Sequence, residues 1–128
     1  MDKTTGLAAV VLIASALPVI GAGTAHASDD VVRRGSCTGS TDWKMKAKPD
    51  DGRIEVESEV DSNRNGQTWR WVLRHDGDVV ARGTSTTRAP SGSFEVSRRT
   101  TDHAGTDSFR FRAVNPASGE VCVGRVSL

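Results

Sequence analysis

The stretch that decides the fold is Gln67–Arg74, QTWRWVLR, which is followed by the turn sequence HDGD at His75–Asp78. Successive side chains of a β-strand point to opposite faces of the sheet. Trp69, Trp71 and Leu73 therefore share one face, and two indoles at a period of two form the largest apolar surface on any predicted strand. The other face carries Arg70, Val72 and Arg74. We predict a central strand and the first half of a hairpin, with the core condensing on the tryptophans.

Strand-like alternation recurs along the rest of the chain, with turn signals about every 8–12 residues and no helical periodicity. The predicted strands are Thr41–Lys48, Arg53–Asp61, Gln67–Arg74, Asp78–Thr86, Ser93–Arg98, Asp107–Val114 and Glu120–Leu128. All six aromatic side chains take the inward parity under this assignment. That agreement predicts an all-β fold, a seven-stranded antiparallel β-sandwich over residues 37–128.

Two turns set the expected register. For the turn 49–52, PDDG, we expect a four-residue loop that pairs Lys48 with Arg53. The lysines before it then face the glutamates after it in a solvated, salt-paired row. The expected pairs are Lys46 with Glu55, Lys44 with Glu57, Ala47 with Ile54 and Met45 with Val56.

For the second turn, Asp76-Gly77 fits either a two-residue type I′ turn or a three-residue loop with Gly77 as a bulge. We favour the three-residue loop, which pairs Arg74 with Asp78. It also places Val79 and Ala81 on the tryptophan face.

The first 27 residues have the layout of a cleaved secretory signal peptide. Lys3 precedes an uncharged apolar run at 7–23, and Ala25-His26-Ala27 provides a small-x-small cleavage site before Ser28. The alternative is a permanent membrane anchor. The run is shorter than the roughly 20 residues that a span needs, and Pro18 interrupts it. We therefore expect a secreted, extracellular protein with no membrane attachment after cleavage.

Two cysteines, Cys37 and Cys122, lie near the two ends of the predicted domain. An even count in an exported chain favours one disulfide bond over two free thiols, and two isolated cysteines lack the spacing of a metal site. Residues 28–36 are expected to form a short polar leader. The formal charge of +1 gives no global acidic or basic signal, and the Arg-, Ala- and Gly-rich composition is typical of a GC-rich bacterial genome.

The segment Asp107–Glu120, DSFRFRAVNPASGE, resembles the F strand and F–G turn of immunoglobulin-like and fibronectin-type-III-like domains. The resemblance implies an Ig-like sandwich, in a layout shared with small secreted bacterial proteins that have no assigned activity. Two family features are missing. The inter-sheet disulfide would need cysteines near Val56 and Phe111, and the tyrosine-corner position is filled by Phe109 or Asp107. Fold analogy alone gives no function.

Asp61, Asn63 and Asn65, with Gly66, match the first half of a calcium loop. Position twelve of that motif is Val72 where a bidentate Glu is needed. The sequence thus allows a weak calcium site, and the alternative is a polar loop in which Asn and Gly adopt left-handed conformations.

Ten arginines and no lysine follow Asn63. Five take outward parity on strands that adjoin in a sandwich, and they form a candidate ligand-binding face for an anionic polymer. These are Arg70, Arg74, Arg82, Arg110 and Arg112. We favour the alternative that these arginines belong to an arginine-rich surface and pair locally with Asp78, Glu95 and Glu120. No specific nucleic-acid binding is expected, because the tryptophans lie on the opposite face from Arg70.

The sequence carries no recognised catalytic motif, and His75 and His103 are expected to be solvated turn residues. The leading prediction is a monomeric, non-enzymatic binding module without a cofactor, whose partner is an unknown extracellular protein or anionic polymer. The candidate surfaces are the arginine-bearing face and the loops Asp61–Gly66 and Arg99–Thr106. One alternative is an inhibitor of an extracellular enzyme that presents the loop Thr87–Gly92. The other is a hydrolase with an unrecognised site.

Overall fold

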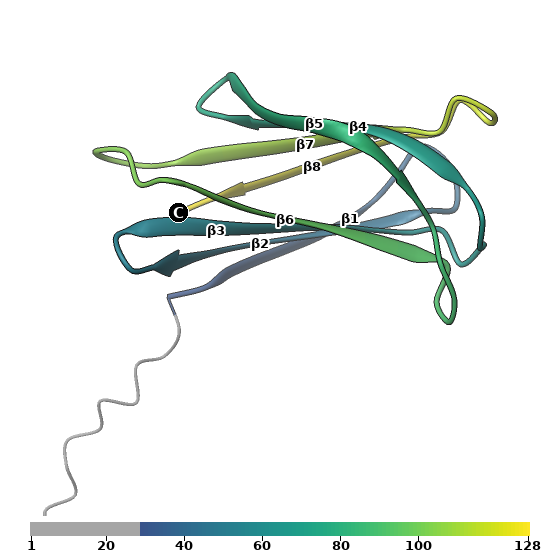
Figure 1. The fold of residues 1–128 in the computed structure, drawn as a ribbon, viewed down its shortest axis with the longest axis horizontal. Coiled ribbons are helices and arrows are strands. Elements are labelled where there is room, and N and C mark those ends of the chain that lie inside the picture. The colour runs from purple at the N-terminus through teal and green to yellow at the C-terminus, as the bar shows by residue number, and fades with distance from the viewer. Residues whose placement is uncertain (1–28) are drawn as a thin grey trace, which may run out of the picture.

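The computed structural model describes residues 29–128, and the predicted signal peptide lies outside them. The described residues form eight strands in two antiparallel four-stranded sheets that pack face to face (Figure 1). None of these residues belongs to a helix long and apolar enough to cross a membrane. The all-β, two-sheet prediction is confirmed at this level.

The strands follow one another in short connections. They are β1 (Val31–Ser36), β2 (Asp42–Asp50), β3 (Arg53–Asp61), β4 (Thr68–His75), β5 (Asp78–Thr86), β6 (Ser93–Thr101), β7 (Ser108–Val114) and β8 (Val121–Ser127). The first sheet has the order β1-β2-β3-β6, and the second has the order β5-β4-β7-β8. The tryptophan strand β4 is therefore an inner strand of the second sheet, between β5 and β7.

The core fills the space between the sheets with the side chains of inward parity. Trp69 is fully buried, and Trp71 stacks on Phe111 with ring centroids 5.7 Å apart. Trp43 is half-buried and packs against the same cluster. Five of the six aromatics are thus buried and the sixth lies at the margin of the core, as parity predicts.

The indole of Trp71 fits a space that its neighbours leave open. Gly83 lies directly opposite Trp71 on β5, where an added Cβ would come within 2.8 Å of the indole. Ser85 accepts a hydrogen bond from Trp71 Nε1 at 3.0 Å. The guanidinium of Arg98 on β6 lies 5.3 Å from the ring centroid, a cation–π contact at the margin of the core. Through Trp71, β4 therefore contacts both its own sheet and the opposite sheet.

The prediction of seven strands is wrong by one. Residues 31–36, which we expected to lie in a polar leader, form β1 and pair with β2 along its whole length. The sequence VVRRGS lacks alternation because β1 is an edge strand and only Val31 and Gly35 are partly buried. Main-chain pairing with β2 holds this strand, and hydrophobic periodicity does not report such pairing.

The register predicted for the β2–β3 hairpin is also wrong, by two residues. Asp51 and Gly52 form a two-residue turn with φ values of 48° and 75°, the type I′ geometry that matches strand twist. The hairpin therefore continues to the pair Asp50–Arg53. The lysine and glutamate row survives with shifted partners. These are Lys48 with Glu55, Lys46 with Glu57, Lys44 with Glu59, Ala47 with Val56 and Met45 with Ser58.

The β4–β5 turn is the two-residue form and not the three-residue loop that we favoured. Asp76 and Gly77 have φ values of 49° and 89°, and Asp78 pairs with His75. An irregularity between Leu73 and Arg74 shifts the register of the residue pairs that lie further from the turn. With this shift, Val79 and Ala81 are half-buried on the tryptophan face, as we expected.

The predicted disulfide is confirmed. Cys37, directly after β1, bonds to Cys122 of β8 with the Cα atoms 4.3 Å apart. Thr38 extends the junction, because its N–H donates to Val121 O at 2.9 Å and its hydroxyl accepts from Val121 N at 2.9 Å. The bridge thus joins an edge of the first sheet to an edge of the second.

Candidate functional site

The outer face of the second sheet carries a concentration of arginines. All five predicted arginines point outward from β4, β5 and β7, and Arg125 of β8 joins them. We call this surface the arginine face, formed by Arg70, Arg74, Arg82, Arg110, Arg112 and Arg125. Sequence reasoning omitted Arg125, although the inward parity of Cys122 and Gly124 implied its direction.

Three of these arginines form one row across adjacent strands. Arg74 lies directly opposite Arg110, and Arg110 lies directly opposite Arg125. Neighbouring strands are about 4.8 Å apart, so three positive charges start from backbone positions spaced by about that distance. Like charges in directly opposed positions destabilise a sheet. The row therefore has an electrostatic cost that a bound anion would remove.

The row lines an open groove of about 460 Å³ at the end of the sheet beside the β4–β5 turn. Ser108 and Ser127 add hydroxyl groups to the same groove. Guanidinium groups and hydroxyls donate hydrogen bonds to phosphate, sulfate and carboxylate oxygens. The composition of the groove therefore suits an anionic group.

The local pairing that we favoured for these arginines is not found among the described residues. The outward positions of the second sheet hold one carboxylate, Asp78, and no arginine of the face forms an ion pair with a carboxylate of residues 29–128. Glu120 instead accepts hydrogen bonds from Thr41 Oγ1 at 2.5 Å and Thr41 N at 3.0 Å. Glu95 lies on β6 in the other sheet. The arginine face thus carries six arginines and one carboxylate, and its net charge is positive.

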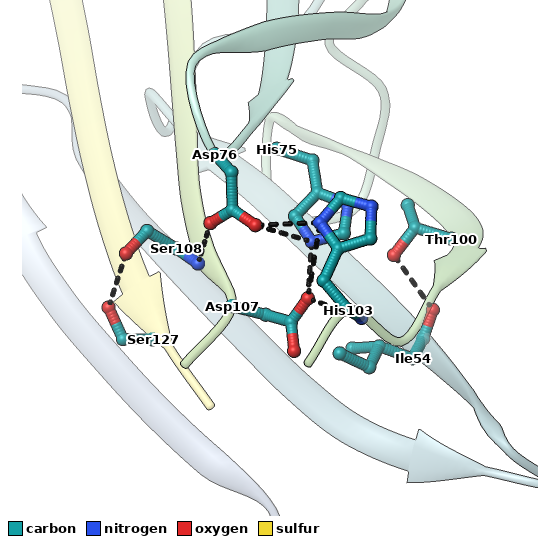
Figure 2. A network of polar contacts seen from close by, with 8 residues as sticks. All are labelled: Ile54, His75, Asp76, Thr100, His103, Asp107, Ser108 and Ser127. Atoms are coloured by element: carbon teal, nitrogen blue, oxygen red, sulfur yellow. Dashed lines mark hydrogen bonds and ion pairs between the residues drawn. The ribbon is translucent and has the colours of Figure 1, made fainter. Parts of the chain in front are cut away.

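A second candidate site lies where β4 ends and β7 begins. His75 is the last residue of β4, Asp76 opens the following turn, and Asp107 directly precedes β7. β4 and β7 are adjacent strands, so these ends meet. The β6–β7 loop brings His103 over them, as Figure 2 shows. We call these four residues the histidine–aspartate cluster.

The contacts within the cluster are short. Asp107 Oδ1 lies 2.6 Å from His75 Nε2, and Asp76 Oδ2 lies 2.7 Å from His103 Nδ1. The two imidazoles stack with centroids 4.0 Å apart and planes 5° from parallel. His75 also stacks on Phe109 at 4.4 Å. His75 and Asp107 are buried, whereas the side chain of His103 is 45% exposed.

Backbone hydrogen bonds orient the carboxylates. Asp76 Oδ1 accepts from Ser108 N at 2.8 Å, and Asp107 Oδ1 accepts from His103 N at 3.0 Å. The backbone of Asp107 exchanges two hydrogen bonds of 2.9 Å with Leu128. Three separate segments and the chain end therefore fix the geometry of the cluster.

These contacts also move the pKa values. The hydrogen bond to Asp76 raises the pKa of His103, and the same bond, with that from Ser108 N, lowers the pKa of Asp76. Burial acts to raise the pKa of Asp107, but hydrogen bonds from His103 N and His75 outweigh it, so this pKa is lowered. The cluster therefore holds two carboxylates in their charged form.

The expectation that both histidines are solvated is wrong for His75. His75 is 2% exposed because it is the last inward residue of β4 and continues the parity of Trp69, Trp71 and Leu73. That parity was readable from the sequence. The proximity of His103 was not, because the course of the β6–β7 loop has no periodic signal.

Among the described residues, no hydroxyl or thiol forms a hydrogen bond with the ring of His75 or His103, so neither histidine is paired with a nucleophile. Its two imidazole nitrogens and two carboxylate oxygens are instead the atoms that bind transition metals.

The predicted calcium-loop residues lie between β3 and β4. Asp61 Oδ1 accepts from Asn63 N at 3.0 Å, and Asn63 has a φ of 56°. This is an Asx turn, which accounts for Asp61 and Asn63 without an ion. The calcium site stays a prediction.

The same loop is bonded to the 87–92 loop. Ser62 N donates to Gly92 O at 3.0 Å, and Thr87 Oγ1 donates to Arg64 O at 2.5 Å. The loop that we considered for an inhibitor is therefore fixed to its neighbour.

Comparisons with known proteins add no family to this description. No protein-family model, no curated protein and no solved structure matches the chain.

Proposed function

We propose that this protein is a secreted, non-enzymatic binding module that recognises an anionic polymer through its arginine face. The observation that carries the proposal is the row Arg74–Arg110–Arg125, three opposed positive charges on a groove without a compensating carboxylate. Arginine provides planar, bidentate recognition of sulfate, phosphate and carboxylate groups. The preferred ligand is a polymer that presents such groups repeatedly, because the six arginines spread over all four strands of the sheet.

The architecture that we propose is an immunoglobulin-like or fibronectin-type-III-like sandwich. The order β5-β4-β7-β8 agrees with C′-C-F-G, and β2-β3-β6 agrees with A-B-E. β1 is then an addition at the edge of the A strand. Domains of this architecture commonly act through exposed strands and loops, which agrees with a binding role.

Secretion is supported by two features of different kinds. The Cys37–Cys122 disulfide persists in oxidising compartments, and the sequence of residues 1–27 has the layout of a signal peptide. An extracellular location would give the arginine face access to anionic polymers of a cell wall or matrix.

The test is retention of the oxidised protein on immobilised heparin, a sulfated polymer, followed by affinity measurements over a range of salt concentrations. We expect saturable binding whose logarithm falls linearly with the logarithm of salt concentration. Elution at low salt would overturn the proposal.

Two triple variants with equal charge separate a specific face from general charge. The test variant is Arg74→Gln/Arg110→Gln/Arg125→Gln, and the control is Arg33→Gln/Arg34→Gln/Arg53→Gln on the first sheet. We expect the test variant to lose most of the affinity and about three units of the salt slope. The control should keep both within about twofold and about one unit. Equal losses in the two variants would contradict a role for this face.

A further inference from the structure

The histidine–aspartate cluster has the composition of a metal site. His75, Asp76, His103 and Asp107 each offer one ligand atom, and these four atoms all lie within 4.8 Å of one another. In the part of the chain that the structure describes, this is the one such group of His, Cys, Asp and Glu side chains. We propose that these four residues bind one divalent transition-metal ion, with Zn²⁺ as the preferred class.

The four histidine–carboxylate distances in the cluster lie within about 1 Å of those in a tetrahedral zinc site. Zn²⁺ lies about 2.0–2.2 Å from nitrogen and oxygen ligands, so its tetrahedral ligands lie about 3.3–3.6 Å from one another. Four of the ligand–ligand distances here are 2.6, 2.7, 3.6 and 3.8 Å. The two short distances are hydrogen bonds, and they lengthen when a metal replaces the shared protons. Shifts of about 1 Å or less in these distances are sufficient.

Contacts with neighbouring groups orient three of the four ligands. Asp76 uses Oδ1 for Ser108 N and keeps Oδ2 toward the centre of the cluster. Asp107 is fixed through its backbone to Leu128 and through Oδ1 to His103 N. His75 is buried and stacks on Phe109. These three ligands are positioned before any ion binds.

The cluster is closed on one side and open on the other. His75 and Asp107 have side chains that are 2% exposed, whereas His103 and Asp76 have side chains that are 45% and 33% exposed. An ion can therefore enter from solvent between the exposed pair and meet the buried pair behind it. The buried side excludes water from two of the four ligands.

One ring must turn when the ion binds. The stacked imidazoles are 5° from parallel, so the in-plane lone pairs of their nitrogens do not converge on one point. His103 is the ring that moves, because it lies on an exposed loop and His75 is enclosed. Metal binding should therefore break the stacking of the two histidines.

The ligand set selects the metal class. Two imidazoles and two carboxylates suit Zn²⁺ and related transition metals, whereas Ca²⁺ and Mg²⁺ prefer sites made of oxygen alone. The two carboxylates also balance the charge of a divalent ion. The site requires neutral imidazoles whose ligand nitrogens carry no proton, so the protons that these nitrogens now share with the carboxylates must move to the other ring nitrogen or leave to solvent on binding.

The experiment titrates the metal-free, oxidised protein with Zn²⁺ in a calorimeter and with Co²⁺ in a spectrophotometer. We expect one saturable Zn²⁺ per chain and the intense visible absorption of four-coordinate Co²⁺. Ca²⁺ and Mg²⁺ should produce no comparable signal. A titration that does not saturate, or that saturates with more than one Zn²⁺ per chain, would overturn the proposal.

Variants distinguish the cluster from other carboxylates. His103→Ala removes an exposed ligand and should lower Zn²⁺ affinity by more than about 100-fold. Glu95→Ala removes an exposed carboxylate of β6 that is outside the cluster, and it should change affinity by less than about threefold. Circular dichroism checks that both variants are folded. Retained affinity in His103→Ala, or an equal loss in Glu95→Ala, would refute the site.

Discussion

Arg110 of β7 lies directly opposite Arg125 of β8 on the outer face of the second sheet. Directly opposed like charges destabilise a sheet. Arg125→Gln should therefore raise the free energy of unfolding by about 0.2–1 kcal/mol at low ionic strength. The gain should vanish in about 1 M salt, where the screening length is about 3 Å. Urea denaturation at low and high salt measures both values.

The matched control for this charge effect is Arg33→Gln on β1, since Arg33 lies opposite Met45 and not opposite a charged residue. This variant should show no salt-dependent gain. The opposed arginines would then be a surface kept at a cost in stability, as binding sites often are. A salt-independent change in Arg125→Gln would contradict this interpretation.

Gly92 and Gly105 provide a second test, because both have positive φ values, of 69° and 81°. An added Cβ at residue 92 would lie 2.3 Å from Arg64 N, whereas the space at residue 105 is open. Gly105→Ala should lower the free energy of unfolding by about 1 kcal/mol through backbone strain alone. Gly92→Ala should lower it by about 1–3 kcal/mol more, because backbone atoms of residues 63 and 64 must move. Equal effects in urea denaturation would show that the contact between these loops is not tight.

The core could be predicted from the sequence because alternation reports burial directly. The parity of Trp69 and Trp71 placed the second sheet correctly, and the same rule applied to Phe109 and Phe111 supplied its neighbour. The arginine face followed from the opposite parity of these strands. We could not predict that these arginines lack carboxylate partners among the described residues, because nothing in the sequence indicates that Glu120 bonds to Thr41 instead.

The alternation of side chains determines neither strand register nor the contacts between loops. A shift of two residues keeps every side chain on its face, so the β2–β3 hairpin had to be decided by turn geometry. Asp51-Gly52 and Asp76-Gly77 both adopt the two-residue turn, which shows that the preference of Asp-Gly for this turn determines the loop length here more than the flanking residues do. The histidine–aspartate cluster joins residues up to 32 positions apart, and only its two buried members, His75 and Asp107, continue the inward parity of the strands beside them.

The disulfide provides a third prediction. Cys37 and Cys122 enclose a separation of 85 residues and join the edges of the two sheets. Cys37→Ala/Cys122→Ala should lower the free energy of unfolding by about 2–5 kcal/mol, as loss of a native bridge does in small secreted domains. Urea denaturation with matched far-ultraviolet circular dichroism measures the loss. An unchanged midpoint would mean that Thr38 and its bonds to Val121 already hold the junction.

Glu120 provides a pH-dependent prediction. Its burial acts to raise its pKa, but the hydrogen bonds from Thr41 outweigh burial, and the pKa lies below the ordinary value of 4.5. The unfolded chain therefore binds a proton at Glu120 at a higher pH than the folded protein does. The stabilisation is complete above pH 4.5 and is lost as the pH falls through the lower pKa of the folded state.

Glu120→Gln removes this titration. Its deficit in free energy of unfolding relative to the wild type should be largest above pH 4.5 and should shrink as the pH falls below that value. The control is Glu95→Gln, an exposed carboxylate of β6 on the outer face of the other sheet, whose stability difference from the wild type should not follow this course. Urea denaturation from pH 7 down to about pH 2.5 measures the three curves. A deficit in Glu120→Gln that stays constant across this range would show that the carboxylate contributes through shape and not through its charge, because only the charged form is lost on acidification.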